Sequence, residues 1–254
     1  MQKLHIKVCE ERAQRDELLF KQPEGTHLGD CPLCSLPLPN DHNKWGLYTC
    51  CYKRICKGCY YANRKREAEM GPQRKCPFCR TGLAKTKEES NKLMMKRVEA
   101  NDPLALYFIG QEKYHEGDYT CAFDYWTRTA SLGNVEAHYR LYVLYRDGKG
   151  VEKDEKRAVW HLEEASIAGH PDARYSLGLF EGGMKCRYSR AMKHFIIAAK
   201  LGHDMSLNEV KNAYKAGHVS KEDFAATLRG HYAAIEATKS AQREKAATFK
   251  RAGI

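Results

Sequence analysis

Apolar and small residues recur at helical spacing from about residue 103 onward, in three successive units. Each unit opens with an alanine followed four residues later by an aliphatic side chain, at Ala105 and Ile109, Ala137 and Leu141, and Ala173 and Leu177. A second alanine is followed, again after four residues, by a bulky side chain, at Ala122 and Trp126, Ala158 and Leu162, and Ala191 and Phe195. Residues four apart share one face of an α-helix, so each unit predicts two helices that pack closely through their small residues.

Each unit closes with a glycine, at Gly133, Gly169 and Gly202, and these glycines are 36 and 33 residues apart. Glycine commonly ends a helix because it adopts the left-handed conformation without strain. A period of this length, with two helices per unit, is typical of an α-solenoid built from helical hairpins. The middle unit, residues 137–154, is the most complete and resembles the Sel-1-like repeat, a relative of the tetratricopeptide repeat.

Helical patterns also flank the repeats. Residues 16–23 predict a short helix that ends at Pro23. Residues 220–223, Ser-Lys-Glu-Asp, form a variant capping box that predicts a long terminal helix to about residue 248. This helix would cover the open end of the solenoid.

Eight of the eleven cysteines lie between positions 31 and 79. They form three Cys-x-x-Cys pairs and one adjacent doublet: Cys31 and Cys34, Cys50 and Cys51, Cys56 and Cys59, Cys76 and Cys79. The tight turn of a Cys-x-x-Cys pair directs two thiolates at one tetrahedral centre, so eight ligands predict two zinc ions. Shells made only of cysteine leave no open coordination position, which favours structural zinc. The remaining three, Cys9, Cys121 and Cys186, are interpreted as small buried hydrophobic residues.

The residues around these cysteines resemble a RING finger over residues 30–82. The resemblance rests on Asp30-Cys-Pro-Leu-Cys34, Ile55-Cys-Lys-Gly-Cys59 and Cys76-Pro-Phe-Cys-Arg80. In the RING cross-brace, alternate pairs share a metal ion. The resemblance therefore implies one site formed by Cys31, Cys34, Cys56 and Cys59, and a second formed by Cys50, Cys51, Cys76 and Cys79.

The second site departs from the common RING pattern. Lys53 stands where most RING fingers have a histidine ligand, and the two doublet cysteines are adjacent, whereas the eight-cysteine variant separates them by one residue. Both thiolates can still reach one zinc ion. The alternative is that only one of them binds and that His42 or water completes the site, although a histidine in such a polar loop is more commonly only solvated.

The RING resemblance implies a ubiquitin ligase that docks a ubiquitin-conjugating enzyme and acts through proximity and orientation, without a covalent intermediate. Leu33 and Pro77 match two of the family's docking positions, and Tyr60 or Tyr61 would supply the third. Arg80 matches the linchpin arginine that bridges enzyme and ubiquitin, and a guanidinium suits this role because it donates to two carbonyls at once. These residues also have plain structural uses, in a small core or on a solvated surface.

The whole layout resembles a family of RING-plus-Sel-1-like-repeat proteins, which share the Leu-Phe-Lys-Gln-Pro lead-in at residues 19–23. The expected fold class is mainly α, with a small zinc-stabilised α+β finger, an α-solenoid and a terminal helix. The expected divisions are 1–29 (N-terminal helix), 30–82 (finger), 83–102 (basic linker helix), 103–204 (three repeats) and 205–254 (capping helices). The solenoid would bind a substrate or adaptor protein; the alternative is a non-catalytic scaffold.

Charge narrows the choice of partners. The chain has 43 Lys and Arg against 32 Asp and Glu, a formal charge of +11, and residues 53–100 alone carry +9. Two zinc ions would release eight thiol protons and lower the formal charge of the protein to +7. The clusters at residues 64–66 and 74–75 lack a recognisable nucleic-acid motif, so a solvated face that meets an acidic protein is the favoured interpretation.

Location is also constrained by the pattern of apolar residues. No apolar run approaches the roughly 18 residues of a membrane span, and the N-terminus lacks the apolar stretch of a signal peptide. A cytoplasmic or nuclear protein with reduced thiols is therefore expected, without a membrane partner.

Overall fold

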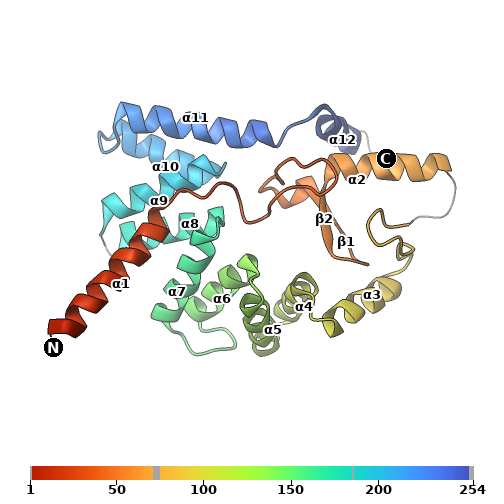
Figure 1. The fold of residues 1–254 in the computed structure, drawn as a ribbon, viewed down its shortest axis with the longest axis horizontal. Helices are drawn as coiled ribbons and strands as arrows, with labels where there is room; N and C mark the ends of the chain where they lie inside the picture. The colour runs from red at the N-terminus through yellow and green to blue at the C-terminus, as the bar shows by residue number, and fades with distance from the viewer. Residues whose placement is uncertain (1, 71–74, 185, 252–254) are drawn as a thin grey trace. The chain divides into compact units, whose positions relative to one another are not determined.

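The computed structural model describes residues 2–70, 75–184 and 186–251. The chain is mainly helical, as predicted, and forms two compact units (Figure 1). One unit contains residues 28–153 and 235–254, and the other contains residues 1–27 and 154–234. Within the described ranges, none of the helices combines the length and the apolar character needed to cross a membrane.

The unit that contains the cysteines is built around a short hairpin. Strands β1 (Trp45–Tyr48) and β2 (Lys53–Cys56) pair antiparallel, with Trp45 opposite Cys56 and Tyr48 opposite Lys53. A 3-10 turn, η1 (His42–Lys44), precedes the hairpin and helix α2 (Lys57–Met70) follows it directly. Tyr60 and Tyr61 therefore lie in the first turns of α2, next to Cys59.

The same unit continues into helices. They are α3 (Lys87–Glu99), α4 (Pro103–His115), α5 (Tyr119–Ser131), α6 (Val135–Asp147) and, from the C-terminal segment, α12 (Ala241–Arg251). Trp126 is 1% exposed and its indole donates to the carbonyl of Tyr107, so this bulky residue of the first repeat lies in the core. Tyr52, directly after the cysteine doublet, packs with Met94 and Val98 of α3, so the linker helix closes over one side of the finger.

The other unit is entirely helical in its described part. It contains α1 (Gln2–Phe20), α7 (Glu155–Ile167), α8 (Pro171–Leu179), the π-helical turn η2 (Phe180–Met184), α9 (Tyr188–Lys200), α10 (Asp204–Lys215) and most of α11 (Lys221–Ala237). Helices α7 to α10 pack as successive neighbours, and α1 packs against α7 and α9. Arg190 of α9 fixes α1 through two hydrogen bonds to Asp16, of 2.6 and 3.0 Å.

Local capping explains where the repeat helices end. Gly133, Gly169 and Gly202 have φ of +82°, +83° and +86°, which confirms the predicted left-handed caps. The prediction of a single long terminal helix was wrong, because this segment forms two helices, α11 and α12. The second helix starts where the Ser240 hydroxyl accepts from the backbone N–H of Arg243.

The interpretation of the unpaired cysteines was also wrong where the structure tests it. Cys121 and Cys186 are exposed. Cys121 lies on the polar side of the amphipathic helix α5, and Cys186 lies in the turn before α9. The side chain of Cys9 lies outside the described part.

Candidate metal centres

The eight clustered cysteines meet in two groups of four. Group one contains Cys31, Cys34, Cys56 and Cys59, and group two contains Cys50, Cys51, Cys76 and Cys79. In each group the four sulfur atoms all lie within 4.8 Å of one another. The structure therefore brings together the same two sets that the cross-brace pairing predicts, although each set joins segments far apart in the sequence.

Group one is assembled by a tight turn and the start of a helix. The N–H of Ser35 donates to the carbonyl of Cys31, and Ser35 adopts a φ of +52° to close this turn. Cys56 ends strand β2 and Cys59 lies in the first turn of α2. Backbone N–H groups also donate to the sulfurs, from Cys56 to Cys31 and from Cys59 to Cys56, both at 3.4 Å.

Group two joins the hairpin turn to the last loop of the finger. Both doublet thiols enter the group: the sulfur of Cys51 is 3.6 Å from that of Cys76, and the sulfur of Cys50 is 3.4 Å from that of Cys79. His42 is exposed, its ring lies 5.2 Å from that of Trp45, and it belongs to neither cysteine group. The geometry thus favours the doublet over the histidine.

The sulfur separations fit a tetrahedral metal ion. With Zn–S bonds of about 2.3 Å, tetrahedral geometry places sulfurs about 3.8 Å apart. The separation between Cys34 and Cys56 is 3.8 Å, and the two values in group two are slightly shorter. Thiolates are the ligands that zinc prefers, so each group could hold one metal ion.

The ionisation of the thiols also favours a cation. Burial opposes the ionisation of Cys31, but N–H donors from Cys56, Leu33 and Cys34 outweigh it and lower its pKa to about 7. In group two, burial likewise opposes ionisation of Cys79, yet the donors of Thr81 lower its pKa to about 6. Burial and the neighbouring thiols raise the pKa of Cys51 to about 11. Four adjacent thiolates therefore need a divalent cation to offset their mutual repulsion.

The side chains predicted to dock a partner lie on the surface of the finger. Leu33 is 44% exposed, and Pro77 and Arg80 are also exposed. Arg80 adopts a φ of +58° as its N–H donates to the carbonyl of Cys76. Tyr60 is half-buried, and the ring of Tyr48 lies 6.0 Å from its ring.

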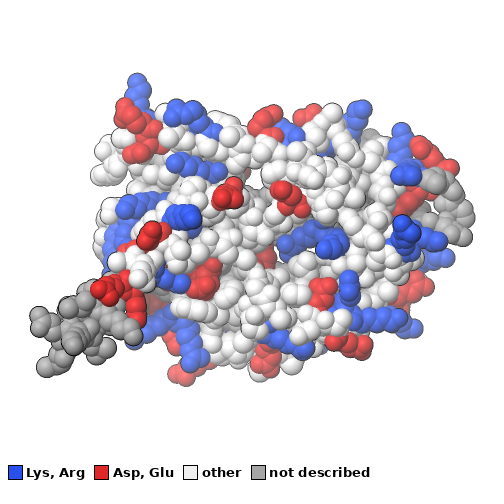
Figure 2. Space-filling model, viewed as in Figure 1, with Lys and Arg blue, Asp and Glu red and all other residues white. Residues whose placement is uncertain are grey.

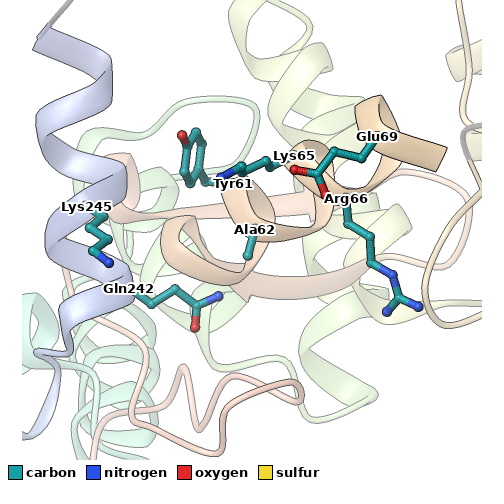
Figure 3. Close-up of a pocket in the computed structure, with 7 residues that line it drawn as sticks. All are labelled: Tyr61, Ala62, Lys65, Arg66, Glu69, Gln242 and Lys245. Carbon is teal, nitrogen blue, oxygen red and sulfur yellow. The ribbon is translucent and has the colours of Figure 1, made fainter. Parts of the chain in front are cut away.

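An aromatic row distinguishes the two tyrosines at the start of α2. Tyr48 also lies 6.1 Å from the ring of Phe78, so Tyr60 is connected through Tyr48 to the loop that carries Pro77. Tyr61 instead lines a pocket of about 320 Å³ between α2 and α12 (Figure 3). Tyr60 therefore packs toward the finger core through the buried Tyr48, and Tyr61 faces the C-terminal helix.

Sequence reasoning missed one residue of this site. Arg243, on α12, places its guanidinium 3.4 Å from the sulfur of Cys34. The two residues are separated by 209 positions, and one arginine in a polar helix carries no local pattern that would have revealed the contact.

Basic and acidic side chains are mixed over the face of the molecule drawn in Figure 2. Lys and Arg are interspersed with Asp and Glu, and no continuous basic surface forms on this face.

The repeats match a known family model. Residues 103–134, 135–170 and 171–203 match the Sel1 repeat, and these stretches correspond to the helix pairs α4–α5, α6–α7 and α8–α9. The predicted Sel1 repeats are therefore confirmed, and the match includes no part of the cysteine-rich segment.

Two curated relatives are similar over part of the chain. "DAP3-binding cell death enhancer 1" of Rattus norvegicus is 29% identical over 200 residues, covering 62% of this chain and 38% of that protein. Its counterpart in Mus musculus is 28% identical over 201 residues, covering 64% and 39%. The chain thus spans about two fifths of the length of these relatives.

Two solved structures are also similar. A Sel1 repeat protein from Oxalobacter formigenes is 22% identical with a TM-score of 0.48, covering 59% of this chain and 64% of that chain. The protective antigen c5321 of uropathogenic Escherichia coli, which has an SLR fold, is 18% identical with a TM-score of 0.44, covering 68% and 37%.

Proposed function

We propose that this protein is a RING-type ubiquitin ligase. Its finger would bind two zinc ions and dock a ubiquitin-conjugating enzyme, and its Sel1 repeats would bind a substrate or adaptor protein. The observation that carries the proposal is the interleaving of the cysteines: the first and third pairs form one group, and the second and fourth form the other. This crossed arrangement ties two loops and one helix into a single rigid platform.

The zinc ions would have a structural role. Each would be enclosed by four thiolates, which leaves no position for a substrate or a catalytic water. The chain would therefore accelerate ubiquitin transfer by holding the conjugating enzyme and ubiquitin in a reactive arrangement. No nucleophile on the finger is required.

Exposed residues of the finger would supply the docking surface. Leu33 and Pro77 present apolar surface from the first and last loops, and Tyr60 would extend it along the aromatic row. Arg80 follows the last cysteine and is free of ion pairs in the described contacts, so its guanidinium is available to donate to the conjugating enzyme and ubiquitin together.

The Sel1 repeats would provide the second binding function. Helical-hairpin repeats commonly present extended surfaces for proteins. The similar rodent proteins carry "DAP3-binding" in their names, which supports a protein partner for repeats of this kind.

Direct binding of a conjugating enzyme tests the proposal. Titration calorimetry against a panel of purified conjugating enzymes should reveal at least one that binds the wild type. Leu33→Ala should weaken this binding about tenfold or more, because an apolar anchor at the centre of an interface carries much of its energy. Leu132→Ala is the matched control, since Leu132 is 41% exposed on the repeats, far from the finger in sequence. Absence of binding across the panel would contradict the proposal.

A non-catalytic scaffold is the second candidate. It is favoured by Lys53, which occupies the position of the usual histidine ligand, lies exposed at the start of β2 and takes no part in either cysteine group. A scaffold would keep both zinc ions and the repeat partner but would not bind conjugating enzymes. The same titrations therefore separate the two functions.

A further inference from the structure

The C-terminal helix α12 packs directly on the finger. It packs against α2 (Figure 3), and the side-chain amide of Gln242 donates to the carbonyl of Gly58 at 3.3 Å. A Cβ atom at position 58 would lie 2.9 Å from both the backbone nitrogen and the Cγ of Arg243. The glycine between the two ligands Cys56 and Cys59 therefore permits an approach that any other residue would prevent.

Arg243 reaches from this helix into the first loop of the finger, residues 31–37. Its Nη1 donates to the carbonyl of Pro37 at 2.7 Å, and its Nη2 donates to the carbonyl of Leu36 at 3.0 Å. The same Nη2 lies 3.4 Å from the sulfur of Cys34. A further bond from Nη1 to the carbonyl of Thr238, at 2.7 Å, joins the guanidinium to the turn that precedes its own helix.

These contacts act on the conformation of the metal-binding loop. The carbonyl of Leu36 also accepts from the N–H of Cys31 at 2.9 Å, so Arg243 and Cys31 hold the same peptide group. A cationic donor to a thiolate is stronger than a neutral one and orients the sulfur toward the metal. Arg243 thus restrains Cys34 both directly and through the loop that carries it.

Group two has a different environment. Cys79 contacts the hydroxyl of Thr81 at 3.3 Å, and Arg97 donates to the backbone carbonyl of Cys51 at 3.3 Å. Within the part of the chain that the structure describes, a guanidinium therefore contacts a cysteine sulfur in group one and a backbone oxygen in group two. The two cysteine groups therefore differ in the arginine contacts that surround them.

We propose that Arg243 is a positioning residue for the metal site of group one, and that α12 serves as a latch on the first loop of the finger. The inference rests on the proposed zinc finger. Retention of zinc by Cys31, Cys34, Cys56 and Cys59 depends on a helix from the opposite end of the chain. The same latch restrains the loop that carries Leu33, so the shape of the proposed docking surface also depends on α12.

The test compares zinc retention in the wild type and in Arg243→Ala. Full-length proteins loaded with two zinc ions are mixed with a chromogenic chelator, and samples are alkylated and mapped by mass spectrometry. Arg243→Ala should weaken zinc binding at group one by about tenfold to a hundredfold, the usual effect of removing an outer-shell partner. Cys34 should become alkylated faster, while Cys50, Cys51, Cys76 and Cys79 keep the wild-type rate.

Further variants separate positioning from general damage. Lys245→Ala is the matched control, because Lys245 is an exposed cation on the same helix. Gly58→Ala should reproduce the effect of Arg243→Ala by displacing the helix, and Arg243→Lys should restore part of the retention. In the cobalt-substituted protein, the sulfur-to-cobalt charge-transfer bands should shift in Arg243→Ala and stay unchanged in Lys245→Ala.

The outcomes distinguish this inference from the proposed function. A wild type that binds no zinc contradicts the zinc finger itself. A wild type that holds two zinc ions, with Arg243→Ala releasing both at the wild-type rate and keeping the cobalt spectrum, overturns the latch alone. Equal acceleration at both groups also overturns it, because the role would then be general stability.

Discussion

The adjacent thiols of Cys50 and Cys51 are the residues at which the finger departs most from ordinary ligand spacing. Both contact partners across group two: the sulfur of Cys51 lies 3.6 Å from that of Cys76, and the sulfur of Cys50 lies 3.4 Å from that of Cys79. The turn between β1 and β2 makes this possible, because Tyr52 takes a φ of +51° immediately after the doublet. Both thiols are therefore expected to bind the same ion.

Zinc content tests this assignment at single residues. Elemental analysis should give two zinc ions per chain for the wild type and about one for Cys50→Ser and for Cys51→Ser, because a three-thiolate shell binds zinc much more weakly. His42→Ala should retain two. Retention of two ions by either cysteine variant, together with loss in His42→Ala, would show that the histidine completes the site.

Much of the chemistry at this scale was predictable because it is local. The Cys-x-x-Cys spacing indicated six members of the two cysteine groups, and the doublet followed from its position between them. The contact of Arg243 was not predictable, since it depends on a tertiary approach through Gly58. The burial of Cys121 and Cys186 was predicted wrongly from residue type alone, without regard to the helix face on which each lies.

At the scale of elements, the first and third repeats each pack a glycine of the first helix against an aromatic ring of the second helix, and the sequence pattern did not reveal this contact. Five residues after the first alanine of a unit stands Gly110, Tyr142 or Gly178. Each glycine meets the large aromatic residue of its own unit: a Cβ would lie 2.6 Å from the indole nitrogen of Trp126 or 2.5 Å from the ring of Phe195. In the middle unit the glycine is replaced by Tyr142, and the large aromatic residue is replaced by Leu162.

This contact predicts that the effect of Gly178→Ala on the free energy of unfolding depends on the residue at position 195. Gly178→Ala should lower the free energy of unfolding by about 1–3 kcal/mol through overpacking. This exceeds the gain of at most about 1 kcal/mol that alanine offers over glycine in a helix. In the Phe195→Leu background the same change should be neutral or stabilising.

The measurement is chemical denaturation of the single and double variants, with Gly183→Ala as the control because a Cβ there meets open space. Equal destabilisation in both backgrounds would contradict the packing argument.

Element positions were largely predictable from sequence, and their tertiary partners were not. The helix pairs of the repeats follow from alanine and glycine spacing because hairpin packing is local. The division between α11 and α12 depends on one serine cap, which a continuous helical pattern concealed. The packing of α12 on α2 has no counterpart in the pattern, because it joins residues more than 180 positions apart.

At the scale of the whole molecule, each compact unit combines segments that are distant in sequence. Residues 235–254 join the unit of the finger, and residues 1–27 join that of residues 154–234. The sequence predicts divisions that follow one another along the chain. It does not reveal which distant segments pack together, because hydrophobic periodicity reports only local structure. The change from α11 to α12 at residues 238–240 matters for this reason: it lets the C-terminal helix become part of the finger's unit.

The central claim is that this unit presents a ubiquitin ligase surface, and an autoubiquitination assay tests it most directly. With activating enzyme, ubiquitin, ATP and a conjugating enzyme that binds the finger, the wild type should form ubiquitin conjugates. Arg80→Ala should retain two zinc ions and its circular dichroism spectrum yet reduce the rate about tenfold to a hundredfold, since the loss affects orientation alone. Arg128→Ala, which removes an exposed arginine from the repeats, should keep the wild-type rate. Conjugate formation by Arg80→Ala at the wild-type rate, or none by the wild type with any conjugating enzyme, would contradict the account.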